Sequence, residues 1–258
     1  MNGSVLPSRG RVTINQVAEA AGVSKASVSR YIGGDRQLLA DATARRIERA
    51  IDQLDYRPNQ MARGLKRGRT RLIGMLVADI LNPYSVAVMH GVETACREHG
   101  YSLVVCNTDR DDEQERHHLA ALQSYNVEGL IVNTLGHHPG ELRALHRELP
   151  MVLVDRQLAE LDTDLVGLDN ADATLCATRQ LRDLGCRLFD EVGLLALDEL
   201  DWYPLVGSGI TALAQPTDEI GRTAFERLLA RLEGDREPAR RVTFPAQLIV
   251  RGSTHPRG

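Results

Sequence analysis

Cysteine is scarce in this chain of 258 residues, and long apolar runs are missing from it. The four cysteines include no Cys-x-x-Cys pair and are too sparse for a disulfide framework, so we expect reduced thiols in apolar positions. No apolar stretch is long enough to span a bilayer, and the N-terminal residues hold no apolar run typical of a signal peptide. We therefore expect a cytoplasmic protein with no membrane partner.

Motifs of enzymes with an α/β fold are missing too. The sequence contains no Gly-x-Gly-x-x-Gly, no Walker loop, no Gly-x-Ser-x-Gly and no cluster at metal-ligand spacing. His137 and His138 lie in a Pro/Gly loop with no third ligand nearby, which argues against a metal. We expect no catalytic residue, no cofactor and no metal. An enzyme stays a rival hypothesis, which a turnover assay would test.

Basic charge is concentrated near the N-terminus. Residues 1–71 contain 14 Lys/Arg and 6 Asp/Glu, a net charge of +8, whereas residues 72–258 contain 17 and 29, a net charge of −12. Neutralising phosphates requires concentrated positive charge, so a polyanion is the expected partner of the N-terminal part alone.

Residues 12–31 predict two short helices joined by a tight turn, the second running from Lys25 to Tyr31. Thr13 with Gln16 forms a capping box, and Val17, Ala18 and Ala21 form an apolar face at helical spacing. Gly22 permits the turn, and Ser24 is a second N-cap. Small residues at the crossing favour a helix-turn-helix, whose second helix enters the DNA major groove.

A third helical pattern at residues 41–54 completes a three-helix head, and a short basic segment at residues 60–69 follows it. This segment contains Gly64 and is too short to form a stable helix alone, so we expect a hinge that folds on DNA. From Arg71 onward, strand-like and helical runs alternate, which predicts an α/β core of parallel sheets with helices on both faces. Ligands bind such sheets at the carboxyl ends of the strands.

Several motifs, taken together, resemble the LacI/GalR family of bacterial transcription repressors, and the resemblance covers nearly the whole chain. They are the pattern at 12–30, Tyr-Arg-Pro-Asn at 56–59, Ile-Gly-Met-Leu-Val-Ala-Asp-Ile-Leu-Asn-Pro-Tyr at 73–84, Val-Asp-Arg at 154–156, Gln-Pro-Thr-Asp-Glu-Ile-Gly at 215–221 and Val-Arg-Gly-Ser-Thr at 250–254. The stretch at 198–206 resembles the branch of the family that answers to sugar acids, especially 2-ketogluconate.

The resemblance implies a homodimer on a palindromic operator, with a small-molecule effector between two lobes that controls a hinge helix. By the family pattern, base reading would fall on Lys25, Ala26 and Arg30. The chemistry agrees for Arg30, since a guanidinium pairs bidentately with guanine. Leu65 would be a wedge in the minor groove. Thr13 is a further DNA-binding candidate. Four other positions would contact or orient phosphates: Ser24, Ser27, Ser29 and Asn59.

The effector-binding candidates are Tyr84, Asp155 and Arg156 in the first lobe and Asp198 and Trp202 in the second. Asp155 with Arg156 forms either a clamp for polyol and carboxylate groups or a surface ion pair; the end of a strand favours the clamp. Trp202 either stacks on a sugar or packs in the core.

The second lobe is shorter than the family pattern requires. The family places two to three βα units, about 60–90 residues, where this sequence passes from Ala173 to Thr174. We therefore expect an internally deleted repressor with an incomplete second lobe. A periplasmic sugar-binding protein is a rival that the basic head argues against, and a remnant that binds DNA but no effector stays open.

The expected organisation is a DNA-binding domain at 1–56, a hinge at 57–70 and a core at 71–258 that binds effector and dimerises. Its first lobe is expected at about 71–160 plus 208–234, and its incomplete second lobe at about 161–207 plus 240–258.

Overall fold

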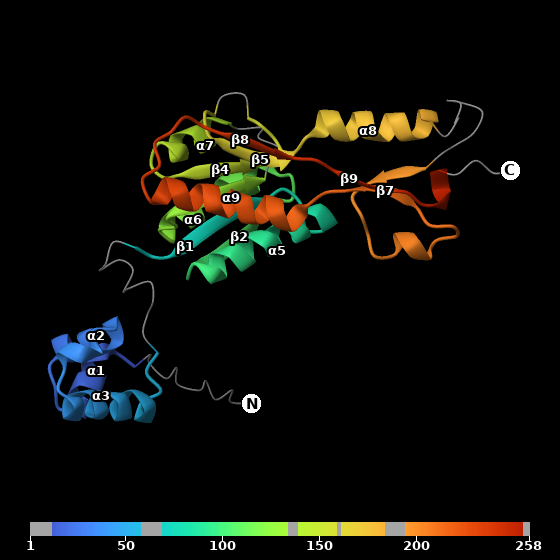
Figure 1. Ribbon diagram of the computed structural model, residues 1–258. Coiled ribbons are helices and arrows are strands. Elements are labelled where there is room, and N and C mark those ends of the chain that lie inside the picture. Colours follow the sequence, from blue (N-terminus) through green and yellow to red (C-terminus); the bar gives the residue numbers. More distant parts are fainter. Residues whose placement is uncertain (1–11, 58–68, 134–138, 159–160, 184–193, 255–258) are drawn as a thin grey trace, which may run out of the picture. The chain divides into compact units, whose positions relative to one another are not determined.

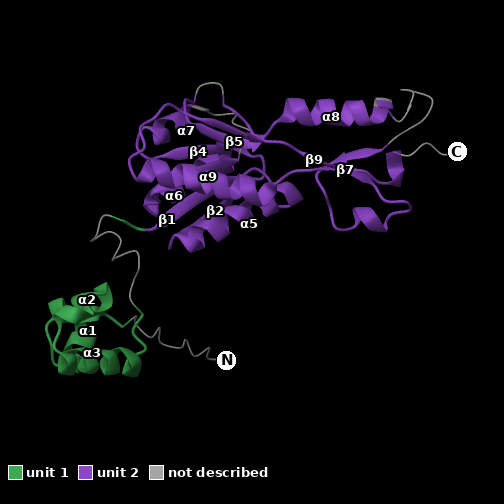
Figure 2. Cartoon of the chain, in the orientation of Figure 1, with its two compact units in different colours: residues 1–70 green, residues 71–258 purple. Residues whose placement is uncertain are grey.

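The computed structural model describes residues 12–57, 69–133, 139–158, 161–183 and 194–254. The chain divides into two compact units, Met1–Thr70 and Arg71–Gly258, shown in green and purple in Figure 2. Asn59, Leu65 and most of the expected hinge lie outside the described residues.

The first unit contains the helices α1 (Ile14–Ala21), α2 (Lys25–Gly33) and α3 (Asp41–Gln53), with a 3-10 turn, η1, at Arg36–Leu38. The predicted capping box of α1 is present, and Ser24 caps α2 as predicted. Gly22 adopts a left-handed φ of 62°, which glycine reaches at no steric cost. The core of this unit consists of Val17, Ala18, Ala21, Val28, Ile47 and Ala50.

A six-stranded parallel sheet organises the second unit, in the order β2-β1-β3-β4-β5-β8 (Figure 1). Its strands are β1 (Leu72–Val77), β2 (Ser102–Asn107), β3 (Gly129–Asn133), β4 (Met151–Val154), β5 (Asp164–Leu168) and β8 (Arg241–Phe244). One face packs against α5 (Pro83–Glu98) and α9 (Thr217–Leu232). The other face packs against α6 (Asp112–Ser124) and α7 (Pro139–His146). Helices on both faces of a parallel sheet confirm the predicted architecture.

Two glycines let α5 and α9 approach each other closely. A Cβ on Gly91 would lie 2.5 Å from the carbonyl oxygen of Asp218, and one on Gly221 would lie 2.2 Å from that of Val88. Both distances are shorter than real Cβ atoms tolerate, so a side chain at either position would push the two helices apart.

A smaller sheet of three strands joins β6 (Leu195–Leu197), β7 (Thr211–Ala214) and β9 (Gln247–Ile249) in the order β6-β7-β9. The pair β6–β7 is parallel and the pair β7–β9 is antiparallel. Leu168, Ala173 and Leu213 form a small core where α8 (Asn170–Asp183) meets this sheet. The short 3-10 turns η2 and η3 lie at Tyr203–Leu205 and Gly252–Thr254.

The sheets divide the chain differently from the expected lobe bounds. Strands β5 and β8, expected in the second lobe, pair with each other in the six-stranded sheet, and β7, expected in the first lobe, lies in the small sheet. The chain therefore crosses between the sheets within single extended stretches, such as the one from β8 to β9, which hydrophobic pattern alone does not reveal.

Helix α8 begins almost directly after β5. Strand β5 ends at Leu168, and the Asp169 carboxylate accepts the N–H of Asp172 as a helix cap. Residues 173–174 lie inside this unbroken helix, where the Thr174 hydroxyl donates to the Asn170 carbonyl. Among the described residues, no helix is long and apolar enough to cross a membrane.

Candidate nucleic-acid interface and ligand site

The predicted base-reading side chains share the exposed face of α2. Lys25, Ala26 and Arg30 are exposed, whereas Val28 is fully buried in the three-helix core. Helix α2 therefore presents one polar face to solvent, and its opposite face packs in the three-helix core. An exposed helix of this kind can enter a major groove without rearranging its core.

The start and the end of α2 are held by side chains. The Ser24 hydroxyl accepts the N–H of Ser27 at 3.1 Å and lies 3.0 Å from the Ser27 hydroxyl. At the other end, burial together with a hydrogen bond to Glu48 raises the pKa of Tyr31. The turn before α2 is tied to α3, because Arg46 donates to the Gly22 carbonyl at 3.5 Å.

The other predicted DNA-binding positions in the described residues surround this face. Thr13 is exposed at the cap of α1, and Ser27 and Ser29 are half-buried on α2. Because Thr13, Ser24 and Ser27 already take part in helix capping, a phosphate would meet side chains whose directions are fixed.

A second group of candidate residues, Tyr84, Asp155 and Asp198, comes together in the second unit. Tyr84 lies in the first turn of α5, after the N-cap Asn82, whose side chain accepts the Tyr84 N–H at 3.0 Å. The tyrosine is 7% exposed, and its buried hydroxyl has no hydrogen-bond partner among the residues that the structure describes. A buried polar group without a partner destabilises the protein unless a bound molecule satisfies it.

Asp155 stands immediately after β4 with a left-handed φ of 72°. Its N–H donates to the Val166 carbonyl of β5 at 2.9 Å, which fixes the backbone at the strand end. Gly167 makes room for this turn, since a Cβ there would lie 3.2 Å from the Cα of Asp155.

Asp198 occupies the equivalent position after β6, also with a φ of 72°. Its N–H donates to the Leu213 carbonyl at 2.9 Å, and its carboxylate accepts a hydrogen bond of 2.6 Å from the Gln215 side chain. Gln215 follows β7 directly, at the carboxyl end of a strand, and is not among the site residues predicted from the sequence.

Electrostatic interactions join the three residues. Burial, followed by the charges of Asp155 and Asp198, raises the pKa of Tyr84 far above its ordinary value. Burial and the charge of Asp198 raise the pKa of Asp155, against the opposing effect of Arg156. Burial also raises the pKa of Asp198, although the Gln215 hydrogen bond opposes it. The carboxylates of Asp155 and Asp198 and the phenol of Tyr84 form a partly buried polar group that can hydrogen-bond the hydroxyl groups of a ligand.

Arg156 and Trp202 lie at more exposed positions. The Arg156 side chain is 62% exposed, and its Nε lies 3.7 Å from the Asp155 carboxylate. Trp202 is 51% exposed and contacts Tyr203 edge to face, with ring centroids 4.7 Å apart. Both the clamp and the ion pair proposed for Arg156 are compatible with this geometry. Trp202 has a free surface on which a sugar could stack.

Neighbouring strand-end residues organise the loop before α5. Asn107 accepts the Ile80 N–H at 3.0 Å through its side chain, and Asp79 accepts both the Leu81 N–H and a hydrogen bond from Arg110. These polar groups are therefore occupied by the protein itself. Among the described residues, no group of histidine, cysteine, aspartate or glutamate side chains is arranged to hold a metal.

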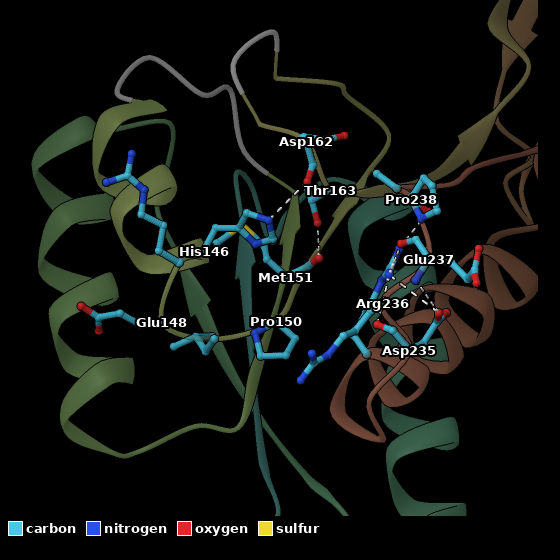
Figure 3. A pocket seen from close by; sticks show the side chains of 14 residues that line it. His146, Glu148, Pro150, Met151, Asp162, Thr163, Asp235, Arg236, Glu237 and Pro238 are labelled. Carbon is cyan, nitrogen blue, oxygen red and sulfur yellow. Dashed lines mark hydrogen bonds and ion pairs between the residues drawn. The ribbon is translucent and has the colours of Figure 1, made fainter.

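A pocket of about 750 Å³ lies elsewhere, at the amino ends of β4 and β5 (Figure 3). His146, Asp162 and Thr163 line one side of it, and Asp235 and Arg236 line the other. Arg231 contributes no free donor, because it holds Asp164 and three backbone carbonyls. Ligands of open α/β sheets bind at the carboxyl ends of strands, so Tyr84, Asp155 and Asp198 stay the candidate ligand group.

Two family models match this chain. The model of bacterial regulatory proteins of the lacI family matches residues 13–59, and the model of periplasmic binding protein-like domains matches residues 62–254. The fold resembles the lac repressor dimer bound to operator and an anti-inducer, with a TM-score of 0.81 over 95% of this chain and 99% of the other, at 17% sequence identity.

Curated relatives extend over the whole chain. The HTH-type transcriptional regulator PtxS of Pseudomonas aeruginosa is 76% identical over 340 aligned positions, which cover 100% of both proteins. The HTH-type transcriptional regulator KdgR of Bacillus subtilis is 34% identical over 95% of this chain and 98% of its own length. Since 340 positions face only 258 residues, at least 82 positions of the first alignment have no counterpart here. The alignment covers 100% of each protein, so the missing positions are internal, as predicted from the sequence.

Proposed function

We propose that this chain, a transcriptional regulator that belongs to the lacI family of bacterial regulatory proteins, binds operator DNA through the exposed face of α2. It acts as a homodimer in the cytoplasm, on a palindromic operator. A sugar or sugar acid such as 2-ketogluconate, bound at Tyr84, Asp155 and Asp198, controls that binding.

The observation that carries the DNA-binding proposal is the exposure of Lys25, Ala26 and Arg30 on a helix capped at its N-terminus and anchored through Val28. Arg30 supplies the bidentate donor that reads guanine, and Ala26 supplies an apolar contact. Thr13, Ser24, Ser27, Ser29 and Asn59 contact or orient phosphates, and Leu65 enters the minor groove.

Selection from a pool of random DNA duplexes tests this proposal directly. A homodimer on a palindromic operator selects two inverted half-sites, because the symmetry of the protein is repeated in the DNA. Retention of every duplex alike, with a strong dependence on salt and no recovered sequence, would show that the basic head binds phosphates alone.

The effector proposal is carried by the unpartnered Tyr84 hydroxyl beside two carboxylates at strand ends. The ligand's hydroxyl groups would bond to Asp155 and Asp198. Arg156, beside Asp155, would supply a cation for the ligand's acid group, and Trp202 would supply a stacking surface. Calorimetry with 2-ketogluconate, with the matching neutral sugar as a control, would test the assignment.

A remnant that binds DNA but no effector is the second candidate function. At least 82 internal positions of the PtxS relative have no counterpart in this chain, and the small sheet has three strands in the described residues. A ligand pocket normally buries most of its ligand, which requires both walls. A stoichiometric, micromolar calorimetric signal from folded protein would exclude this candidate.

A further inference from the structure

Arg71, the first residue of the second unit, has a backbone conformation that side chains rarely adopt. Its φ is +55°, in the left-handed region. Such a residue persists only where its surroundings hold it. Here the Arg71 N–H donates to the Glu128 carboxylate at 2.6 Å, and its carbonyl accepts the Ser102 N–H at 2.9 Å. The chain therefore enters β1 in a direction fixed from both sides.

The Arg71 side chain is held as well, although it is exposed. Its Nη1 donates to the His99 carbonyl at 3.0 Å, and its guanidinium carbon lies 5.2 Å from the centre of the Tyr101 ring. A guanidinium over an aromatic face adds a cation–π attraction to the hydrogen bond. A lysine would keep the charge but lose the planar group that matches both contacts.

Helix α9 connects this place to the candidate ligand site. The rings of His99 and Tyr101 contact Phe225 of α9, with centroids 5.3 and 5.7 Å apart. Phe225 is fully buried, and α9 begins two residues after Gln215, which holds Asp198. Helix α9 therefore begins near the proposed ligand group, and along its length Phe225 contacts the rings of His99 and Tyr101, which hold Arg71.

We propose that Arg71 is a positioning residue for DNA binding, clamped by Glu128, His99 and Tyr101. The clamp fixes the direction in which the chain enters β1 at the first residue of the second unit, and side chains packed along α9 connect Arg71 to the proposed ligand group. This inference rests on the proposed DNA-binding function.

The variant Glu128→Ala distinguishes an effect of the clamp on DNA affinity from an effect of charge alone. Removal of a negative charge strengthens binding to DNA if charge alone matters, whereas loss of the clamp weakens it. We expect affinity for a duplex selected by the wild-type chain to fall about fivefold or more, and affinity for a scrambled duplex to change less than about twofold. Glu93→Ala, which removes an exposed carboxylate paired with Arg97 on α5, is the matched control and should not weaken binding.

Arg71→Lys provides a second test that keeps the charge at an exposed position. The proposal predicts weaker binding to the selected duplex with an unchanged unfolding midpoint. Wild-type affinity in Arg71→Lys together with equal or tighter binding in Glu128→Ala would overturn it. A wild-type chain that selects no sequence would defeat the proposed function, and this inference with it.

Discussion

Asp155 and Asp198 repeat one local geometry in two different sheets. Each follows directly on a parallel strand, each has a φ of 72°, and each donates its N–H to a carbonyl of the neighbouring strand at 2.9 Å. The two carboxylates face the same buried tyrosine, whose pKa both of them raise. The proposed ligand site is thus built from two equivalent strand ends.

Asp198→Asn should stabilise the unliganded protein at neutral pH. Burial raises the pKa of Asp198 above 3.8, so its ionised form costs stability above the folded pKa, and this cost disappears as the pH falls toward 3.8. The amide oxygen can still accept the Gln215 hydrogen bond. We expect a gain of up to about 1 kcal/mol at pH 7, reduced by partial exposure, and no gain below pH 4. Urea unfolding at both pH values measures it, with the exposed Asp201→Asn as control. An equal gain at both pH values would contradict the assignment.

Tyr84→Phe should raise stability and lower ligand affinity together. The substitution removes only the hydroxyl that lacks a partner in the unliganded protein, a relief of about 1 kcal/mol. If the hydroxyl binds the effector, the same change weakens calorimetric binding. Tyr125→Phe, at a tyrosine that is 45% exposed, is the control. Lower stability in Tyr84→Phe would show that the hydroxyl is already satisfied.

Asp164→Asn should destabilise the second unit strongly. The side chain is 0% exposed and accepts hydrogen bonds from Arg227, Arg231 and the Arg240 N–H. Loss of one partner of a buried ion pair costs about 3–5 kcal/mol. Burial acts to raise the pKa of Asp164, but these hydrogen bonds outweigh it and hold the pKa below 3.8.

The stabilisation by Asp164 is therefore present above pH 3.8 and lost as the pH falls through the lower, folded pKa. The difference between wild type and Asp164→Asn should shrink in that acidic range. Unfolding curves at pH 7 and pH 3 would show it, with the exposed Asp162→Asn as control. A difference that does not depend on pH would point to packing rather than to charge.

The local signals of the sequence predicted the first unit well. Thr13 with Gln16, Gly22 and Ser24 each act within a few residues, so their caps and turn follow from spacing alone. The parallel core followed in the same way from the alternation of strands and helices.

The partner of each extended stretch could not be predicted in this way. The stretch at 241–249 contributes β8 to one sheet and β9 to the other, because pairing depends on residues far apart in the chain. For the same reason Gln215 was missed: its partner Asp198 lies 17 residues earlier, and only the pairing of β6 with β7 brings them together.

Base reading by α2 is tested most directly by the affinity of Arg30→Ala and of the wild type for a selected duplex and for a scrambled duplex. Loss of a bidentate contact to guanine costs about 1–3 kcal/mol on the selected duplex and relaxes the preference at one base pair of each half-site. Arg49→Ala, at an exposed arginine of α3, is the matched control for lost charge. A selective loss in Arg30→Ala, absent from Arg49→Ala, is the result that we predict. An equal loss on both duplexes would contradict base reading by α2.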